Sequence, residues 1–328
     1  MSLPNLEISS VCTLFEGNYL KGVAVLVNSL YRQGFRGDIY IGYKGLLSGW
    51  AAGAKFNPGL CWSGGQTLEV KEDLLLHFLP LDTDYHLTNY KPDFMLRLWE
   101  GPAKSASHIF YFDPDIVVTA PWTFFSQWVG YGVALCEDVN SPLPEFHPKR
   151  VEWRRYFERN GIKLVFKENI YVNGGFIGVS EKNRAFLQVW KAVQEAMAKE
   201  IGGLHRSSLK GTALLREKSG PFAPFGKTDQ DALNAAIEGW EGKASLIGKE
   251  GMAFDPGAVV MPHALGQPKP WSKNFLSAAI DGRPPSKADK EYWVNTTGLI
   301  RIYNPIYIKL KWCSILLASF IGRFYRRY

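Results

Sequence analysis

The stretch that decides the fold runs from residue 8 to residue 43. It opens with ISSVCTLF (8–15), an apolar run of the length of a buried strand, and closes with a second such run, DIYIGY (38–43). The segment between them, from Tyr19 to Tyr31, carries apolar residues at helical spacing, namely Val23, Leu26, Val27 and Leu30. A strand, a helix and a strand in this order predict a βαβ unit, and therefore an α/β fold with parallel strand pairs.

Further elements are predicted along the chain on the same grounds. Strands are expected at His108–Phe112, Ile116–Thr119, Val133–Cys136 and Gly175–Val179. Helices are expected at Pro92–Trp99, behind the N-cap candidate Ser180, and at Asp229–Ile237. The run Leu74–Leu79 is apolar but ambiguous, and residues 202–227, which are rich in Gly, Ser and Lys, are expected to form a long loop.

Composition is typical of a globular protein. The 328 residues suffice for one large domain or two small ones, and 46% of them are hydrophobic and 21% charged. A disordered chain would carry fewer apolar residues, and a multispanning membrane protein would carry more. The first ten residues lack the order of a secretory signal, and the longest apolar run, Cys313–Gly322, has about half of the roughly 20 residues that span a bilayer. We therefore expect the chain not to cross a membrane.

The cysteines give a prediction about the compartment. There are four of them, Cys12, Cys61, Cys136 and Cys313, separated by long and irregular gaps with no C-x-x-C pair. This spacing argues against a disulfide framework or a zinc site, and it favours a reducing compartment.

Two acids directly follow the strand predicted at 108–112. Asp113 and Asp115 project to the same side of an extended chain, so they can share one divalent cation. The end of a strand in an open α/β sheet is also where ligands bind, and oxygen ligands favour Mg²⁺ or Mn²⁺. Two other Asp-x-Asp pairs, beginning at Asp82 and Asp229, lack this strand context. The interpretation as a metal site competes with that of a solvated turn.

A second candidate lies in the string MPHALGQPKPW (261–271). His263 can ligate a metal through a neutral ring nitrogen, Gly266 lets the backbone approach a ligand closely, and Lys269 can place a charge on a phosphate. A lone histidine is more often a structural residue, but His-x-x-Gly-x-x-Lys-Pro-Trp is a constrained pattern.

The order of these pieces resembles that in glycosyltransferase family 8, the family of glycogenin and of bacterial lipopolysaccharide galactosyl- and glucosyltransferases. The opening from Val11 to Leu30 matches, and so does Arg97, sixteen residues before Asp113. The resemblance covers about Val11 to Trp271. Its motifs are Asp113-x-Asp115 after an apolar strand, Asn173-Gly174-Gly175, Asp229-Gln230-Asp231, and the string from His263 to Trp271, which is the most specific of them.

The resemblance implies an α/β fold of the GT-A type, Rossmann-like with a mixed central sheet. It also implies retaining transfer of a hexose from a UDP-sugar with Mn²⁺, or alternatively Mg²⁺. By this resemblance the metal would be held by Asp113, Asp115 and His263, and Lys269 would contact the diphosphate. Other donor-site residues would be Thr13, Tyr19, Arg97, Asp138, Asn173 and Gly266, while Asp229 and Gln230 would face the anomeric carbon and the acceptor.

Two routes to retention remain open at this point. The acceptor can attack from the same face, with a diphosphate oxygen taking its proton, or Gln230 can stabilise an oxocarbenium-like state. Some residues depart from the family pattern: Ala264 stands where an aromatic residue is usual, and Gly174 where Ser or Ala is common. These departures bear on the sugar and the acceptor more than on the metal site.

The C-terminal extension is basic and aromatic. The net charge is +7, and residues 301–328 contain no acid and six cations, namely Arg301, Lys309, Lys311, Arg323, Arg326 and Arg327. They bracket the apolar run, a composition typical of an interfacial membrane anchor; the alternative is an element packed on the core. We expect a GT-A domain at 1–275, with a nucleotide-binding half at about 1–120 and an acceptor half at about 121–275, and an anchoring extension at 276–328.

Other functions fit the sequence less well. A near-match to a phosphate loop at 220–228 has one residue too many between its glycines, two prolines and no preceding strand. Only the charge of the tail favours nucleic acid, and the sequon at Asn295 is interpreted as chance. A catalytically inactive GT-A module that binds a nucleotide-sugar or a glycan stays as the alternative.

The sequence therefore predicts an enzyme, a metal-dependent retaining hexosyltransferase. It is expected in the cytoplasm, peripheral to a bacterial inner membrane, where residues 301–328 contact the anionic surface. The expected acceptor is a glycan or a glycolipid such as lipopolysaccharide, and no nucleic-acid partner is expected.

Overall fold

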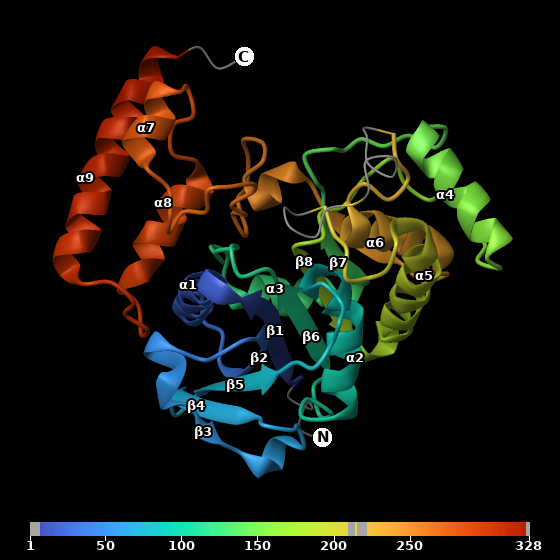
Figure 1. Ribbon diagram of the computed structural model, residues 1–328, viewed down its shortest axis with the longest axis horizontal. Helices are drawn as coiled ribbons and strands as arrows, with labels where there is room; N and C mark the ends of the chain where they lie inside the picture. The colour runs from blue at the N-terminus through green and yellow to red at the C-terminus, as the bar shows by residue number, and fades with distance from the viewer. Residues whose placement is uncertain (1–6, 209–213, 215–221, 326–328) are drawn as a thin grey trace, which may run out of the picture.

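A nine-stranded mixed sheet forms the centre of the protein, and helices cover both of its faces (Figure 1). The computed structural model describes residues 7–208, 214 and 222–325. The sheet order is β3-β4-β5-β2-β1-β6-β8-β7-β9. The strands are β1 Ser9–Glu16, β2 Gly37–Lys44, β3 Lys55–Phe56, β4 Gln66–Lys71, β5 Leu74–Pro80, β6 His108–Phe112, β7 Val133–Cys136, β8 Phe176–Ser180 and β9 Ala244–Ile247.

Strand directions confirm the predicted class. β1 pairs in parallel with β2 and β6, and β2 pairs in parallel with β5, as the βαβ unit requires. The sheet is mixed because β8 runs antiparallel to both β6 and β7, and β4 runs antiparallel to β5. The predicted α/β class with a mixed central sheet is therefore confirmed.

The helices predicted at 19–31, at 92–99, behind Ser180 and at 229–237 are formed, whereas those at 122–128 and 148–159 were not predicted. The α-helices are α1 Leu20–Arg32, α2 Lys91–Glu100, α3 Trp122–Trp128, α4 Pro148–Arg159, α5 Ala185–Ile201, α6 Thr228–Gly239, α7 Phe275–Ile280, α8 Lys287–Val294 and α9 Pro305–Ile321. The helix behind Ser180 starts later than expected, because a 3₁₀ turn, Glu181–Asn183, comes first and Ser180 makes no side-chain cap.

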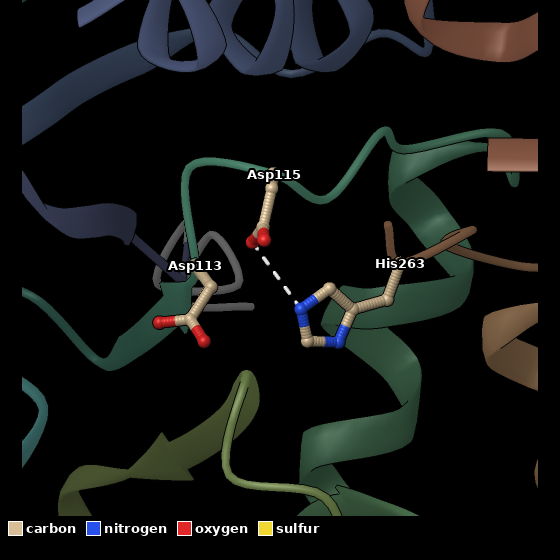
Figure 2. A group of neighbouring side chains, drawn as sticks. All are labelled: Asp113, Asp115 and His263. Atoms are coloured by element: carbon tan, nitrogen blue, oxygen red, sulfur yellow. Dashed lines mark ion pairs between the residues drawn. The ribbon is translucent and has the colours of Figure 1, made fainter. Parts of the chain in front are cut away.

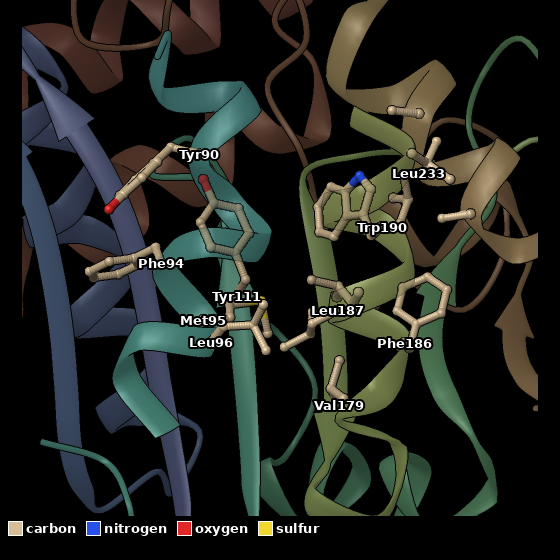
Figure 3. Packing of buried hydrophobic residues seen from close by; sticks show 14 of the residues in the cluster. Tyr90, Phe94, Met95, Leu96, Tyr111, Val179, Phe186, Leu187, Trp190 and Leu233 are labelled. Carbon is tan, nitrogen blue, oxygen red and sulfur yellow. The ribbon is translucent and has the colours of Figure 1, made fainter. Parts of the chain in front are cut away.

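Alternation along the strands divides the core into two layers. In β1, Val11 and Phe15 face the cluster that includes α1 and α3, while Cys12 and Leu14 face the cluster that includes α2, α5 and α6. Figure 3 shows the second cluster, where side chains of α2, β6, α5 and α6 meet. The five residues of β6 are all buried, and this explains why the strand reads as a continuous apolar run.

One of the predicted strands is not formed. Ile116–Thr119 does not form a strand; it makes a single bridge, from Ile116 to His263. Its backbone instead bonds to the segment 260–262, with the amide of Val117 donating to the carbonyl of Pro262 at 3.1 Å and that of Thr119 to Val260 at 2.9 Å. This local pairing joins two parts of the chain that lie about 150 residues apart in the sequence.

The predicted long loop is described only in part. Residues 202–208, 214 and 222–227 form no helix or strand, and the remainder, with the first two residues of the phosphate-loop near-match, lies outside the described residues. The same holds for Arg326 and Arg327 of the basic tail.

The last three α-helices form a layer of their own (Figure 1). They enclose a third apolar cluster that includes Phe275, Trp293 and Ile315 and reaches the body of the protein through Val25 of α1. The extension is therefore packed against the body. The boundary at residues 275 and 276, and the division into nucleotide and acceptor halves, stay predictions.

The final helix is longer than the apolar run suggested. α9 continues into a 3₁₀ turn, so helical structure extends over Pro305–Phe324, a segment with mean hydropathy 1.3 that is long and apolar enough to cross a membrane by length and composition alone. The apolar run seen in the sequence, Cys313–Gly322, is shorter than this helix because Lys309 and Lys311 interrupt the apolar pattern within the first turns. The expectation that the chain does not cross a membrane stays a prediction.

A close contact with α1 positions the loop that carries the two acids. A Cβ atom added at Gly22 would lie 2.1 Å from the carbonyl oxygen of Pro114, the residue between Asp113 and Asp115. Only glycine permits this approach of a helix to the loop.

Replacing this glycine should destabilise the protein. Gly22→Ala should lower the free energy of unfolding by about 1–3 kcal/mol, because overpacking outweighs the gain in helix propensity. Gly130→Ala, where an added Cβ meets no heavy atom within 4 Å, is the control and should be near neutral. Urea denaturation measures both, and a Gly22→Ala protein as stable as the control would contradict the contact.

Candidate active site and metal centre

Three side chains meet at the end of β6, as the sequence predicts. Asp113 and Asp115 follow the strand directly, and the pairing of 115–119 with 260–264 carries His263 to them. One ligand atom from each of the three lies within 4.8 Å of the others (Figure 2). Two carboxylate oxygens and an imidazole nitrogen are a donor set suited to Mn²⁺, and to Mg²⁺ less well.

Asp115 is the electrostatic centre of this group. Its carboxylate is buried, with His263 Nε2 at 3.2 Å from Oδ1 and the ammonium of Lys269 bonded to Oδ2. Burial by itself raises the pKa of Asp115, but His263 and Lys269 more than offset it, so the pKa is held well below its usual value. Burial lowers the pKa of Lys269 and Asp115 raises it, with a net increase. The two groups are therefore charged together.

The orientation of His263 is fixed from behind. Its Nδ1 lies 3.2 Å from Asn173 Oδ1, which also accepts the amide of Gly175 at 2.8 Å, and Asn173 Nδ2 donates to Asp138 Oδ2 at 2.7 Å. Because the Asn173 oxygen is only an acceptor, Nδ1 carries a proton, and Nε2 is the ring nitrogen that faces Asp115 and that could bind a metal ion. Asn173 and Asp138 thus support the metal centre from a buried layer.

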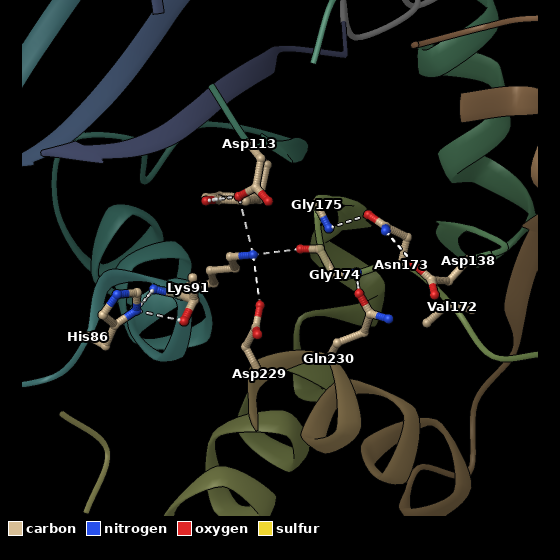
Figure 4. A network of polar contacts seen from close by, with 12 residues as sticks. His86, Lys91, Asp113, Asp138, Val172, Asn173, Gly174, Gly175, Asp229 and Gln230 are labelled. Carbon is tan, nitrogen blue, oxygen red and sulfur yellow. Dashed lines mark hydrogen bonds and ion pairs between the residues drawn. The ribbon is translucent and has the colours of Figure 1, made fainter. Parts of the chain in front are cut away.

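A residue that the sequence analysis missed, Lys91, joins the metal ligands to α6. Its side chain is fully buried at the start of α2, and its Nζ lies 2.7 Å from the Gly174 carbonyl, 3.0 Å from Asp229 Oδ2 and 3.2 Å from Asp113 Oδ1 (Figure 4). Burial lowers its pKa, but the two carboxylates raise it further, so the net shift is upward. A lysine at a helix N-terminus opposes the macrodipole, and this local anomaly is the only signal the sequence offered.

Asp229 and Gln230 occupy the first turn of α6 with different surroundings. Asp229 lines the cleft, and its charge is matched by Lys91. Gln230 is buried, and its Oε1 accepts the amide of Gly174 at 3.1 Å. Of this predicted pair, Asp229 is the one that faces the cleft.

The cleft contains Tyr19, Gly266 and Lys269 of the predicted donor site, while Asn173 and Asp138 lie behind His263. It is lined by Leu14, Phe15, Glu16, Tyr19, His86, Leu87, Thr88, Tyr111, Asp113, Pro114, Asp115, Ser208, Asp229, His263, Leu265, Gly266 and Lys269. Tyr19 accepts a hydrogen bond from Gln267 Nε2 at 3.0 Å and packs edge-on against Trp271. Gly266 has φ +70°, a conformation that favours glycine, as close backbone approach to a ligand requires. His86 and Thr88 were not predicted, since no motif marks them.

Two predicted donor residues lie elsewhere. Thr13 is fully buried within β1, and the cleft is lined instead by its neighbours Leu14 to Glu16. Arg97 lies near the end of α2, donates to the hydroxyl of Tyr90 at 2.6 Å and stacks over the ring of Trp62 at 4.0 Å. Arg97 comes six positions after Lys91 on the helix, so the two face different directions. Lys91 is the cation that α2 brings to the cleft-lining acids Asp113 and Asp229.

Two solved structures are similar in fold. The glycosyltransferase GlyE of Streptococcus pneumoniae TIGR4 is 14% identical with a TM-score of 0.48, over 94% of this chain and 63% of that one. The apo form of the bifunctional glycosyltransferase WbbM is 14% identical with a TM-score of 0.43, over 95% of this chain and 53% of that one. The chain thus spans less than two thirds of either. No protein-family model and no curated protein matches it.

Removing the Lys91 cation should expose the repulsion that it suppresses. Lys91→Met should lower the free energy of unfolding by about 3 kcal/mol, because it leaves two partly buried acids without their buried counter-ion. Asp229→Asn in the same background should restore part of the loss, and a double-mutant cycle by urea denaturation measures the coupling. Strictly additive effects would show that Lys91 and Asp229 do not interact in solution.

Proposed function

We propose that this protein is a metal-dependent glycosyltransferase that moves a hexose from a UDP-sugar to a glycan or glycolipid acceptor. The observation that carries the proposal is the convergence of Asp113, Asp115, His263 and Lys269 in one cleft at the carboxyl end of β6. The match of motif order to glycosyltransferase family 8 supports the finer assignment, and with it retention of configuration and manganese as the ion.

Each residue near the diphosphate has its own role in the proposed reaction. Mn²⁺ held by Asp113, Asp115 and His263 would act as a Lewis acid toward the negative charge that grows on the leaving diphosphate. Lys269, whose ammonium is already at the edge of the cleft, places a second positive charge beside the same oxygens. Asn173 holds the His263 ring in its ligating orientation, and Gly266 leaves room for the diphosphate to approach the backbone.

Asp229 is the residue we assign to the sugar end of the cleft. Its carboxylate lines the cleft and pairs with the ammonium of Lys91 at 3.0 Å. An anion placed there favours the positive charge of an oxocarbenium-like state. Gln230, which is bonded to the Gly174 amide, acts by positioning this turn of α6 rather than by contact. This arrangement is compatible with same-face attack of the acceptor.

The acceptor and location follow from the C-terminal extension. We propose a lipopolysaccharide or similar glycolipid acceptor and a cytoplasmic site of action peripheral to a bacterial inner membrane. The support is the acid-free, cationic composition of residues 301–328 together with the family resemblance. The alternative, an inactive module that binds a nucleotide-sugar, would keep the metal site and lack turnover.

Isosteric removal of one metal ligand tests the proposal. With Mn²⁺ and a UDP-sugar, the protein should release UDP, and Asp115→Asn should reduce the rate about a hundredfold or more, because Lewis-acid stabilisation contributes several kcal/mol. Asp82→Asn, in another Asp-x-Asp pair outside the cleft, is the matched control and should leave the rate unchanged.

Thermal shift provides the second readout of this experiment. Mn²⁺ together with UDP should raise the Tm of the wild type and of Asp82→Asn but not of Asp115→Asn. A Tm response without UDP release from any nucleotide sugar would favour the binding module. Full activity in Asp115→Asn would rule out the metal assignment.

A further inference from the structure

An uninterrupted apolar stripe runs along the outer face of the last helix. Its members recur in steps of four and three residues, so they share one side of the helix. Five of them have between 56% and 75% of their surface exposed, and the cysteine among them is exposed as well. The stripe consists of Ile306, Leu310, Cys313, Leu317, Phe320 and Phe324. Exposure of this many large apolar side chains on one face indicates a surface that is covered in use.

The opposite face of α9 is already occupied. Ile308, Ile315 and Ala318 are buried against the layer of α7 and α8. Lys311 belongs to this inner face, where its Nζ donates to the Lys273 carbonyl at 3.1 Å and lies 5.7 Å from the ring of Phe275. A helix that crossed a bilayer would have to leave these contacts and carry Lys309 and Lys311 toward the apolar interior, which is costly.

The charge of the segment decides what covers the stripe. Residues 301–328 contain no acid, so a second copy packed along the stripe would bring cations against cations. Lys309 is exposed on the flank of the stripe, directly before Leu310 and one turn before Cys313. A lysine in this place can reach phosphate groups while its neighbours enter an apolar phase. An anionic lipid surface complements both the apolar stripe and the charge beside it.

A cationic pocket lies at the C-terminal end of the same helix. It is lined by Lys290 of α8, by Ser319 and Arg323, and by Pro284 and Tyr325, with no acid in the lining. The Oγ of Ser319 is buried and has no hydrogen-bond partner among the described residues. The helix can close the pocket because Gly322 carries no side chain: an added Cβ would lie 2.5 Å from Cβ of Pro284. Two cations and an unpaired hydroxyl are groups that bind a phosphate.

We propose that α9 lies in the plane of an anionic phospholipid surface, with its apolar stripe inserted and a lipid phosphate bound between Lys290 and Arg323. The inference deepens the peripheral location in the proposed function and makes it specific: the helix docks on the leaflet and does not cross it. UDP release from a soluble reaction mixture does not depend on docking, so the two proposals fail separately.

Vesicle sedimentation with the full chain tests the docking. The protein should sediment with vesicles of phosphatidylcholine and phosphatidylglycerol, much less with phosphatidylcholine alone, and high salt should release it. Lys290→Ala with Arg323→Ala should weaken the partition about thirtyfold, since each cation near an anionic leaflet contributes about fivefold. Lys55→Ala with Lys104→Ala removes the same charge from two exposed sites away from the pocket and should have little effect.

The stripe is tested by a second pair of variants. Leu317→Ser with Phe320→Ser should abolish sedimentation, whereas Leu46→Ser, at an exposed leucine outside α9, should not. UDP release serves as the check that each variant is folded, because none of these residues lines the catalytic cleft.

Four outcomes would overturn the inference. If the Lys290/Arg323 pair and the control pair lost vesicle binding equally, diffuse charge alone would explain the binding and the phosphate site would be ruled out. If Leu317→Ser with Phe320→Ser left sedimentation unchanged, insertion of the apolar stripe into the lipid would be ruled out. Membrane association that resists both high salt and alkaline carbonate would show that α9 crosses the bilayer. A change of oligomeric state in the stripe pair, without any vesicle binding by the wild type, would assign the stripe to a second copy.

Discussion

The neutralisation of three carboxylates in one cleft is the constraint on which the rest of the site depends. Asp113, Asp115 and Asp229 approach one another at the carboxyl end of β6 and the start of α6, and each is matched by a cation or an imidazole from another element. Lys91 matches two of them from α2, and Lys269 with His263 matches the third from the segment after residue 260. Without these partners, repulsion between the three carboxylates would push apart the elements that carry them. A divalent ion would share Asp115 with the groups that already neutralise it.

The sequence predicts the metal ligands because their signals are local. An apolar strand followed by Asp113 and Asp115, and a constrained string around His263, can each be recognised within ten residues, and the family resemblance supplies their pairing. Lys91 could not be predicted in the same way. Its role depends on a carbonyl at residue 174 and a carboxylate at residue 229, contacts that only the folded chain creates. Arg97 is the reverse case: the family resemblance implies a place near the donor, whereas in the fold its side chain contacts Tyr90 and Trp62.

In the fold, too, local signals are predicted from the sequence and tertiary contacts are not. Strong periodicity predicts β1, α1, β2 and β6 to within about two residues at each end. The pattern of a buried strand or of an amphipathic helix depends only on the residues of that element. Ile116–Thr119 has the composition of a strand, yet it pairs with an irregular segment because its neighbour in space is the chain before His263 rather than a sheet edge. The small helices α7 and α8 are buried around Trp271 and Trp293, a tertiary cluster without a periodic signal.

The pairing of residues 115–119 with residues 260–264 also has a consequence for synthesis. The two acids leave the ribosome early, while the imidazole that completes the ligand set follows only after about 150 further residues, a delay of roughly 7–30 s at ordinary elongation rates. During that interval the nascent chain can form β1, α1, β2 and β6 but cannot assemble all three ligands. Unfinished chains therefore lack a complete set of candidate ligands, and a metal ion could meet all three side chains only after His263 has been made.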